Sequence, residues 1–195
     1  MQKPEDRRIR KTKRLLKQGL CALMQEKDFH TITVKELTDY TDLNRGTFYL
    51  HYTDIYDLLE KIEDEVLGEF QAMVDASRPQ TSPANLMPIL EPVADYIEQN
   101  YSVCKVLFCN VSADHFLMRF QKFIMQNGIS FIKESFVISE NPQLDAYLVF
   151  ISNGITGLLR SRMTGSALQQ KQEIVSLCHK IIISSATALL GEKKK

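Results

Sequence analysis

The chain lacks the features that mark a membrane protein or a secreted one. Its 195 residues contain no run of about 18 or more apolar residues, the length that a membrane-spanning helix needs. The first residues, Met-Gln-Lys-Pro-Glu-Asp, are polar and are followed by basic residues, whereas a signal peptide has an apolar core at this position. We therefore expect a cytoplasmic protein with no membrane partner.

Motifs for covalent, metal or nucleotide chemistry are missing as well. The cysteines Cys21, Cys104, Cys109 and Cys178 form no C-x-x-C pair, and each lies in an apolar helical pattern typical of small buried residues. There is no Gly-rich phosphate loop, no G-x-S-x-G and no H-E-x-x-H. We expect no enzyme activity, no catalytic residues, no cofactor and no bound metal.

A net charge is absent from the whole chain but not from its parts. Residues 1–53 hold 11 Lys and Arg against 7 Asp and Glu, a net of +4. Residues 54–195 hold 13 against 17, a net of −4. This distribution, with basic residues concentrated between Arg7 and Arg14, indicates a negatively charged partner for the first part.

Apolar residues recur at helical spacing along nearly the whole chain, so the sequence predicts an all-α fold. The expected helices cover, in chain order, about 6–26, 34–40, 44–52, 53–76, 85–100, 102–111, 113–137, 142–163 and 167–190. The stretch Arg78-Pro79-Gln80-Thr81-Ser82-Pro83, between the fourth and fifth of these helices, is typical of a linker.

Polar residues with favourable capping side chains precede three of the expected helices. Thr33 is expected to cap the second helix, because Glu36 follows it in capping-box register. Asn44 is expected to cap the third helix and Thr53 the fourth. The acidic residues of the fourth helix are expected on its solvated side: Glu60, Glu63, Asp64, Glu65 and Glu69.

The segment from Thr33 to Leu59 is the most informative part of the sequence. It reads T-V-K-E-L-T-D-Y-T-D-L-N-R-G-T-F-Y-L-H-Y-T-D-I-Y-D-L-L and predicts two short helices around a tight turn. In a helix-turn-helix the first helix braces the second, which lies in the major groove of DNA. Phe48 and Tyr52 are expected beneath the second helix. Gly46 would let it approach a duplex closely, at a cost of about 1 kcal/mol in helix propensity.

The pattern R-G-T-F-Y-x-H-Y followed by x-D-x-x-D-L-L resembles the TetR family of bacterial transcriptional regulators over about residues 9–60. The resemblance implies that Thr33 and the amides of the second helix hold a phosphate, and that Arg45 and Thr47 approach bases or phosphates. It also implies that Tyr49 and His51 touch the DNA backbone. The full set of implied DNA-binding residues is Thr33, Lys35, Asn44, Arg45, Gly46, Thr47, Tyr49, Leu50 and His51.

The chain departs from the family at the turn between these two helices. The family often has Ala-Gly-Val there, and this sequence has Thr41-Asp42-Leu43. Aspartate tolerates the left-handed backbone conformation that glycine would supply, so we expect the turn to be kept.

The rest of the chain resembles the C-terminal domain of a Firmicutes-type branch of the same family. The motifs are Y-I-E-Q-N-Y from Tyr96 and Y-L-V-F-I-S-N-G-I-T-G-L-L-R from Tyr147. The resemblance implies a dimer in which the last two helices of each subunit form a four-helix interface. Residues 174–190 agree, because their apolar surface is larger than one neighbouring helix can cover. Gly154 and Gly157 would let two helices approach closely.

An aromatic-rich set in the second half of the chain has two interpretations. A packed core is the default. The alternative is a small-molecule pocket, because the family commonly binds an effector between these helices. Such an effector pocket would be lined by Phe108, Phe120, Phe123, Tyr147 and Phe150.

These patterns together predict a homodimeric, sequence-specific DNA-binding regulator of transcription. Residues 1–52 would form a three-helix, helix-turn-helix DNA-binding domain, and residues 53–195 a helical bundle for regulation, ligand binding and dimerisation. The expected partners are a double-stranded DNA operator, a second copy of the chain and a small-molecule effector, with repression relieved by the effector. One alternative is the same fold acting through a protein partner rather than DNA. A helical enzyme is the second, and the sequence offers no site for it.

Overall fold

The computed structural model of the chain describes residues 7–82, 85–110, 114–135, 143–165 and 170–190. The helices in these ranges are α1 (Arg7–Glu26), η1 (Phe29–Thr31), α2 (Val34–Tyr40), α3 (Arg45–Tyr49), α4 (Ile55–Ser77), η2 (Arg78–Gln80), α5 (Met87–Gln99), α6 (Tyr101–Cys109), α7 (Asp114–Ser135), α8 (Gln143–Met163) and α9 (Lys171–Leu190). The described ranges contain no β-strand beyond one backbone bridge between Ser82 and Asn85. The predicted all-α fold is confirmed.

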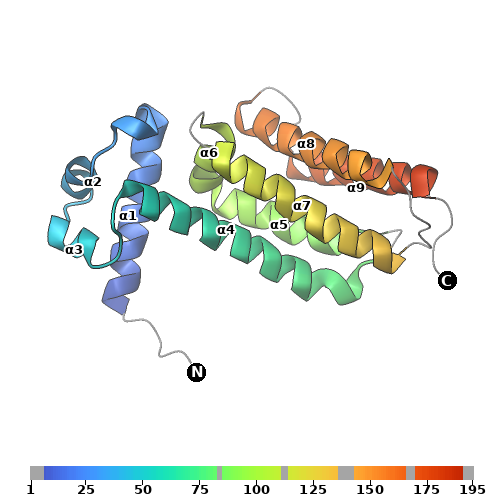
Figure 1. Cartoon of the computed structure of the whole chain (residues 1–195), viewed down its shortest axis with the longest axis horizontal. Helices are drawn as coiled ribbons and strands as arrows, with labels where there is room; N and C mark the ends of the chain where they lie inside the picture. Colours follow the sequence, from blue (N-terminus) through green and yellow to red (C-terminus); the bar gives the residue numbers. More distant parts are fainter. Residues whose placement is uncertain (1–6, 83–84, 111–113, 136–142, 166–169, 191–195) are drawn as a thin grey trace.

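Two groups of helices are joined by one long helix (Figure 1). Helices α1, α2 and α3 form a module at one end, and α5 to α9 form a bundle at the other. Helix α4 begins beside the module and continues along the bundle, where it packs against α5 and α7. At 23 residues α4 is about 34 Å long, so it connects the two ends directly.

The helix starts in the module follow local capping chemistry. The backbone N–H of Glu36 donates to Oγ1 of Thr33 at 3.2 Å, and that of Gly46 donates to Oδ1 of Asn44 at 2.7 Å, so both predicted caps are confirmed. The prediction for α4 was wrong by one residue. Asp54 is the cap, and its carboxylate accepts the N–H of Asp57 at 2.8 Å.

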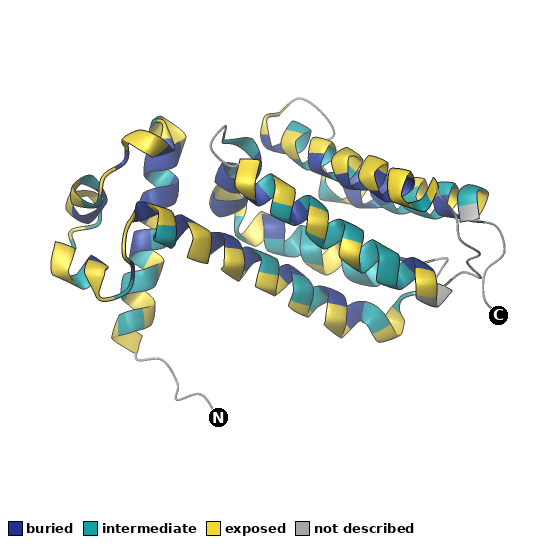
Figure 2. Ribbon diagram, in the orientation of Figure 1, coloured by how far each residue is buried: buried dark blue, intermediate teal, exposed yellow. Residues whose placement is uncertain are grey.

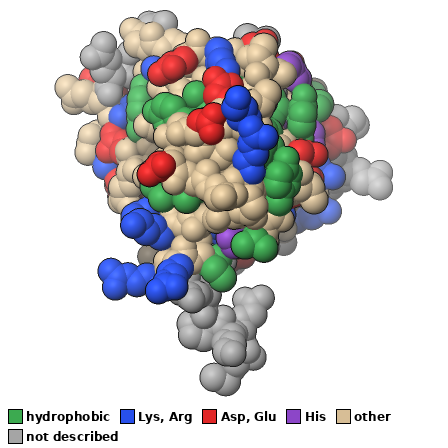
Figure 3. All heavy atoms as spheres, turned by 90° about the vertical axis from the view of Figure 1, so that its left-hand side faces the viewer, with side chains coloured by type: hydrophobic (Ala, Val, Ile, Leu, Met, Phe, Trp, Pro, Cys, Tyr) green, Lys and Arg blue, Asp and Glu red, His purple; other side chains and the backbone are tan. Residues whose placement is uncertain are grey.

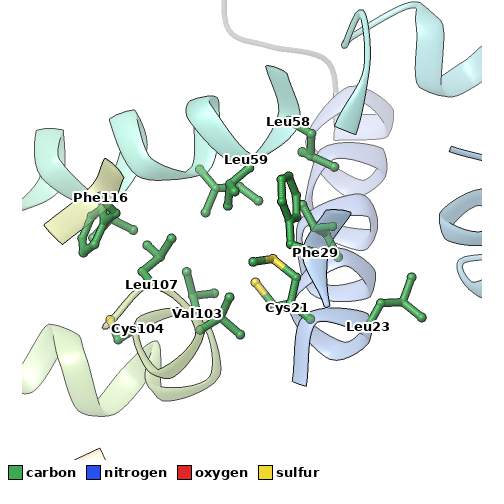
Figure 4. Packing of buried hydrophobic residues seen from close by; sticks show 14 of the residues in the cluster. Cys21, Leu23, Phe29, Leu58, Leu59, Val103, Cys104, Leu107 and Phe116 are labelled. Atoms are coloured by element: carbon green, nitrogen blue, oxygen red, sulfur yellow. The ribbon is translucent and has the colours of Figure 1, made fainter. Parts of the chain in front are cut away.

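One apolar core continues from the module into the bundle. Cys21 and Leu23 of α1 and Phe29 of η1 belong to one cluster with Leu58 and Leu59 of α4 (Figure 4). The same cluster extends through α6 to α7, and its members there include Val103, Cys104, Leu107 and Phe116. Each fully buried side chain of this size contributes about 1.5–3 kcal/mol. The module therefore lies against the bundle through packed side chains as well as through α4.

A second cluster lies at the other end of the bundle, between α7, α8 and α9. Its buried members are Ile132, Tyr147, Leu148, Ile151 and Ala186. Outer faces of α4, α7 and α8 are exposed along their length (Figure 2). None of the described helices is both long and apolar enough to cross a membrane.

Glu63 does not follow the expected pattern for α4. Its acidic neighbours Glu60, Asp64, Glu65 and Glu69 are exposed as predicted, but Glu63 itself is 2% exposed. The prediction that Glu63 lies on the solvated side of the helix was wrong. Its carboxylate points toward α7 and accepts hydrogen bonds there, which removes much of the penalty of burying it.

Candidate nucleic-acid interface

The turn between α2 and α3 sets the angle of α3. Asp42 has a φ of 52°, in the left-handed region that aspartate tolerates better than most residues. The turn is closed by the N–H of Leu43, which donates to the carbonyl of Thr38 at 2.9 Å. The expectation that Asp42 replaces a glycine in this turn is confirmed.

Gly19 of α1 lets the first helix lie directly on this turn. A Cβ at Gly19 would clash with Cγ2 of Thr41 and would lie 3.0 Å from Cδ1 of Leu37. The close approach fixes α2 and the turn against α1, and α3 follows from the turn. Sequence reasoning missed Gly19, because Gly19 and Thr41 are 22 positions apart and no local pattern relates them.

Helix α3 has an apolar underside and an exposed outer face. Phe48 is fully buried and Tyr52, just after the helix, is 7% exposed. Arg45 is exposed, Tyr49 is 58% exposed and Leu50 is 79% exposed, a large apolar surface on a small element. The other residues singled out on this segment divide between exposed (Asn44 and Gly46) and half-buried (Thr47 and His51). Because Phe48 is packed into the core, the opposite side of α3, with Arg45 and Tyr49, faces solvent.

Thr33 and Lys35, at the start of α2, are exposed. Figure 3 views the end of the molecule that carries the module. Lys and Arg side chains gather at its lower left, and a His and several apolar side chains lie close to them. Most Asp and Glu side chains on this face lie in the upper half. A basic edge of this kind attracts a negatively charged partner.

The start of α4 is tied to the end of α3. Lys61 donates to the carbonyl of His51 at 3.2 Å and lies over the ring of Tyr52, 5.1 Å from its centroid. It also pairs with Asp57 at 3.0 Å. The N–H of Thr53 donates to the same carboxylate oxygen of Asp57 at 2.8 Å, and this bond, followed by Lys61, lowers the pKa of Asp57. A movement of α4 would therefore also displace the residues that follow α3.

A second anchor joins α4 to the segment before α2. The hydroxyl of Tyr56 and Nδ1 of His30 are 3.1 Å apart, and the rings of Tyr56 and Phe29 meet edge to face. Phe29 is buried, so this contact rests on the core of the module. Sequence reasoning did not single out Tyr56 or Phe29.

The bundle contains an apolar cavity of about 180 Å³ between α4, α5, α7, α8 and α9. Three residues of the expected effector pocket line it, namely Phe120, Phe123 and Tyr147. Two do not, and the expectation is corrected for them. Phe108 is fully buried in the core, edge-on to Phe120, and Phe150 is 69% exposed on the outside of α8.

Sequence reasoning missed the part of the cavity wall that comes from α4 and α9. Phe70 and Val74 of α4 and Ile182 and Ile183 of α9 line the cavity. Residues 174–190 were expected to supply a dimer interface, but within this segment the side chain of Ile182 faces the inside of the subunit. Helical periodicity places these residues on the apolar side of their helices, but it does not tell which neighbouring helix that side packs against. Within the described ranges, no group of three His, Cys, Asp or Glu residues could hold a metal ion.

Known proteins resemble this chain in sequence and in fold. The family model described as transcriptional regulator C-terminal region, TetR_C_8, matches residues 84–184. YxbF of Bacillus subtilis (strain 168), described as an HTH-type transcriptional regulator, is 30% identical over 117 residues. That match covers 58% of this chain and 30% of YxbF, so it spans less than a third of that relative.

Solved structures share the fold over nearly the whole chain. A TetR-family regulator from Syntrophomonas wolfei aligns with a TM-score of 0.68 and 15% identity, covering 93% of this chain and 98% of that one. A TetR regulator from Streptococcus agalactiae 2603V aligns with a TM-score of 0.64 and 21% identity, covering 91% and 97%. Because the family model matches more than half of the residues, the chain belongs to the TetR family of transcriptional regulators.

Proposed function

We propose that the protein binds a specific double-stranded DNA operator through α2 and α3 and represses transcription from it. The observation that carries the proposal is the outer face of α3. Phe48 is completely buried beneath it, while Arg45 and Tyr49 are exposed above it. A braced helix with compact polar and aromatic groups on its free side has the form that enters a major groove.

The residues on this surface take different roles. Arg45 and Thr47 lie in the first turn of α3, where side chains reach base edges, and they would contribute most to the choice of sequence. Tyr49, His51, Thr33 and Lys35 would hold phosphates and position the module. Phosphate contacts strengthen binding to all sequences alike.

A homodimer would present two such surfaces. Half-sites on one face of the duplex are about 34–36 Å apart, which two modules at the ends of a dimer can span. Helix α8 carries an exposed apolar stripe with Val149 at 46% and Phe150 at 69% exposure, and a Cβ at Gly154 or Gly157 would meet nothing within 4 Å. This stripe supports dimerisation through α8 and α9.

The cavity supports a regulatory role for the bundle. Because α4 lines the cavity with Phe70 and contacts the end of α3 through Lys61, an occupant could change the separation of two α3 helices. An occupant moves the equilibrium between DNA-binding and released forms only by its different affinity for the two.

A mobility-shift titration against the DNA upstream of the protein's own gene tests the proposal. We expect a specific complex that forms with Tyr40→Phe as with the wild type, since Tyr40 is an equally exposed tyrosine that we assign no role. Arg45→Ala should lower affinity for the operator more than for random DNA, and Tyr49→Phe should lower both by similar factors. A folded protein that binds operator and random DNA equally would favour the alternative of a protein partner.

A further inference from the structure

The wall of the cavity is almost entirely apolar, so its few polar groups decide what can enter. Among the lining residues that the structure describes, Asn127 of α7 is the one amide and Arg78 is the one charged residue. Arg78 already takes part in an interaction of its own. The hydroxyl of Tyr147 donates to the carbonyl of Ile182 at 3.0 Å. Asn127 is therefore the polar group to consider for a ligand.

The amide of Asn127 faces that of Gln71 on α4. Nδ2 of Asn127 donates to Oε1 of Gln71 at 3.1 Å and to the carbonyl of Phe123 at 3.0 Å, so both of its N–H bonds are used. The return bond, from Nε2 of Gln71 to Oδ1 of Asn127, is long at 3.4 Å. Nε2 of Gln71 also donates to Asp75 at 2.9 Å. Oδ1 of Asn127 thus has only a long bond, and Asn127, unlike Gln71, lines the cavity, so Oδ1 is the acceptor to consider for a ligand donor.

We propose that the cavity binds a small uncharged molecule with an apolar body and one hydrogen-bond donor, and that Oδ1 of Asn127 accepts that donor. The volume of about 180 Å³ is slightly larger than an apolar cavity of roughly 150 Å³ that holds benzene, so a singly substituted ring fits. A charged ligand is disfavoured, because burying a charge against an almost entirely apolar wall is costly and the charged lining residue Arg78 already takes part in another interaction. A ligand without a hydrogen-bond donor would gain nothing from Oδ1 of Asn127, which would keep only the long bond from Gln71.

The position of the Asn127–Gln71 pair also gives the ligand a way to act on α4. Gln71 lies 16 residues after Ile55 on the same helix, about 24 Å along its axis. A ligand donor at Oδ1 of Asn127 replaces the long bond from Nε2 of Gln71, so that of the two amide bonds between α4 and α7 only the one from Nδ2 of Asn127 to Oε1 of Gln71 stays. This weakens one of the polar ties between α4 and α7. This last step rests on the proposed DNA-binding function, whereas ligand binding itself does not.

Calorimetric titration of the full chain with three probes of similar size tests the ligand class. Toluene has no hydrogen-bonding group, benzyl alcohol has one donor, and benzoate is charged. We expect benzyl alcohol to bind at least tenfold more tightly than benzoate. We also expect it to bind more tightly than toluene once the difference in their transfer from water to hydrocarbon is subtracted. A wild-type protein that binds none of the three, or that prefers benzoate, overturns the proposal without any variant.

Two asparagine variants test the assigned atom. Asn127→Leu should weaken benzyl alcohol about tenfold, the loss of one hydrogen bond, and leave toluene within about twofold. Asn153→Leu is the matched control, because Asn153 accepts from Gln121 at 3.0 Å in a similar amide pair between α7 and α8 outside the cavity. It should leave all three affinities unchanged. Equal weakening of toluene and benzyl alcohol by Asn127→Leu would show that the amide only supports the cavity shape.

The regulatory step has its own readout. Benzyl alcohol should release operator DNA from the wild type. Gln71→Leu, which lacks the bond that competes for Oδ1 of Asn127, should bind benzyl alcohol at least as tightly but respond at least threefold less in DNA release. An unchanged response in Gln71→Leu overturns the role of the pair. If the wild type binds no operator at all, the proposed function fails. The proposal for the cavity is still tested, because the calorimetric titrations do not involve DNA.

Discussion

The carboxylate of Glu63 on α4 lies 3.1 Å from the guanidinium of Arg119 on α7, measured between Oε2 and Nη1. The same oxygen lies 2.9 Å from Nδ1 of His115, and Arg119 also contacts Asp64. Glu63 is almost completely buried, so its charge depends on these partners. The cluster holds α4 against α7 in the half of α4 that is nearer to the α1–α3 module.

Removal of Arg119 should therefore destabilise the fold. Arg119→Met keeps an unbranched, flexible apolar side chain but removes the guanidinium, which leaves Glu63 with His115 as its remaining partner in this cluster. We expect the free energy of unfolding to fall by about 2 kcal/mol, as measured by urea denaturation at pH 7. Lys122→Met, an exposed basic residue on the same helix, should change it by less than about 0.5 kcal/mol.

The double variant Glu63→Gln with Arg119→Met separates charge from packing. It should be more stable than Arg119→Met alone, because no uncompensated charge is then buried. A double variant as unstable as the sum of its two single variants would mean that the pair contributes no coupling energy.

Glu63 also shows where sequence reasoning stops. Its spacing from Leu59, Val66 and Phe70 places it in the apolar stripe of α4, yet its residue type indicated solvent. Glu63 is buried because of its position in the stripe. The hydrogen bond from Arg119, 56 residues later in the sequence, makes this burial possible. No local pattern contains that information.

Local chemistry was predicted well where the cause is local. The bounds of α2, the caps Thr33 and Asn44 and the left-handed Asp42 all follow from residues a few positions apart. Thr53 and Asp54 are both good capping residues, and the structure has the carboxylate of Asp54 accepting the N–H of Asp57, while Asp57 accepts the N–H of Thr53. The sequence pattern does not distinguish these two registers.

The cavity was predicted in part for the same reason. Phe120, Phe123 and Tyr147 face it as expected. Phe150 lies three residues after Tyr147 but faces outward, because the buried side of α8 continues through Leu148 and Ile151 instead. Which face of a helix meets its neighbours depends on the packing of α7 and α9 against it, and that is a tertiary property.

The stability that Asp57 contributes should depend on pH. Its pKa is lowered in the folded state, first by the N–H of Thr53 and then by Lys61, so folding favours its charged form. This contribution is present above the unfolded pKa of about 4 and is lost as the pH falls through the lower folded value. Asp57→Asn should therefore lower the melting temperature at pH 7, and the difference from the wild type should shrink toward pH 3. Glu60→Gln, on the exposed side of α4, should show no such trend.

The four cysteines should differ sharply in reactivity. Burial raises the pKa of the Cys21 thiol to about 11 and that of Cys104 to about 12, and it also raises the pKa of Cys178. Burial raises the pKa of Cys109 too, but this residue is only half-buried, so a reagent can reach it. Labelling of the native protein with a disulfide reagent at pH 8 should show one fast thiol, which Cys109→Ser removes. Two or more fast thiols would contradict the packing around α1, α6 and α9.

The basic start of α1 should add to DNA affinity through counterion release. Arg7 and Arg10 are exposed in the first turns of the helix. Replacing both with Gln should reduce the slope of log affinity against log salt by about one to two units, because each neutralised phosphate contributes about 0.9. Lys180→Gln, an exposed residue of α9, should leave the slope unchanged. An unchanged slope in the Arg7 and Arg10 variant would show that this end of α1 does not reach the DNA.

The exposed stripe on α8 should be the centre of the dimer. Phe150→Glu places a charge where an apolar contact with a second subunit is proposed, and burying it there without a partner costs several kcal/mol. Light scattering should show a monomer for this variant at a concentration where the wild type is a dimer. Met118→Glu on α7, where the native side chain is 62% exposed, is the control and should stay dimeric.

Far-ultraviolet circular dichroism separates loss of the dimer from loss of the fold. Phe150 is exposed within the subunit, so its replacement should leave the helical signal unchanged. Ile182→Asp, by contrast, should unfold or loosen the subunit, because Ile182 lines the cavity. Ile181 is the α9 residue to change at the interface, since 41% of it is exposed. If Phe150→Glu and Ile181→Glu both remain dimers of normal helicity, the two subunits meet elsewhere. The proposed spacing of the two α3 helices would then have no basis in α8 and α9.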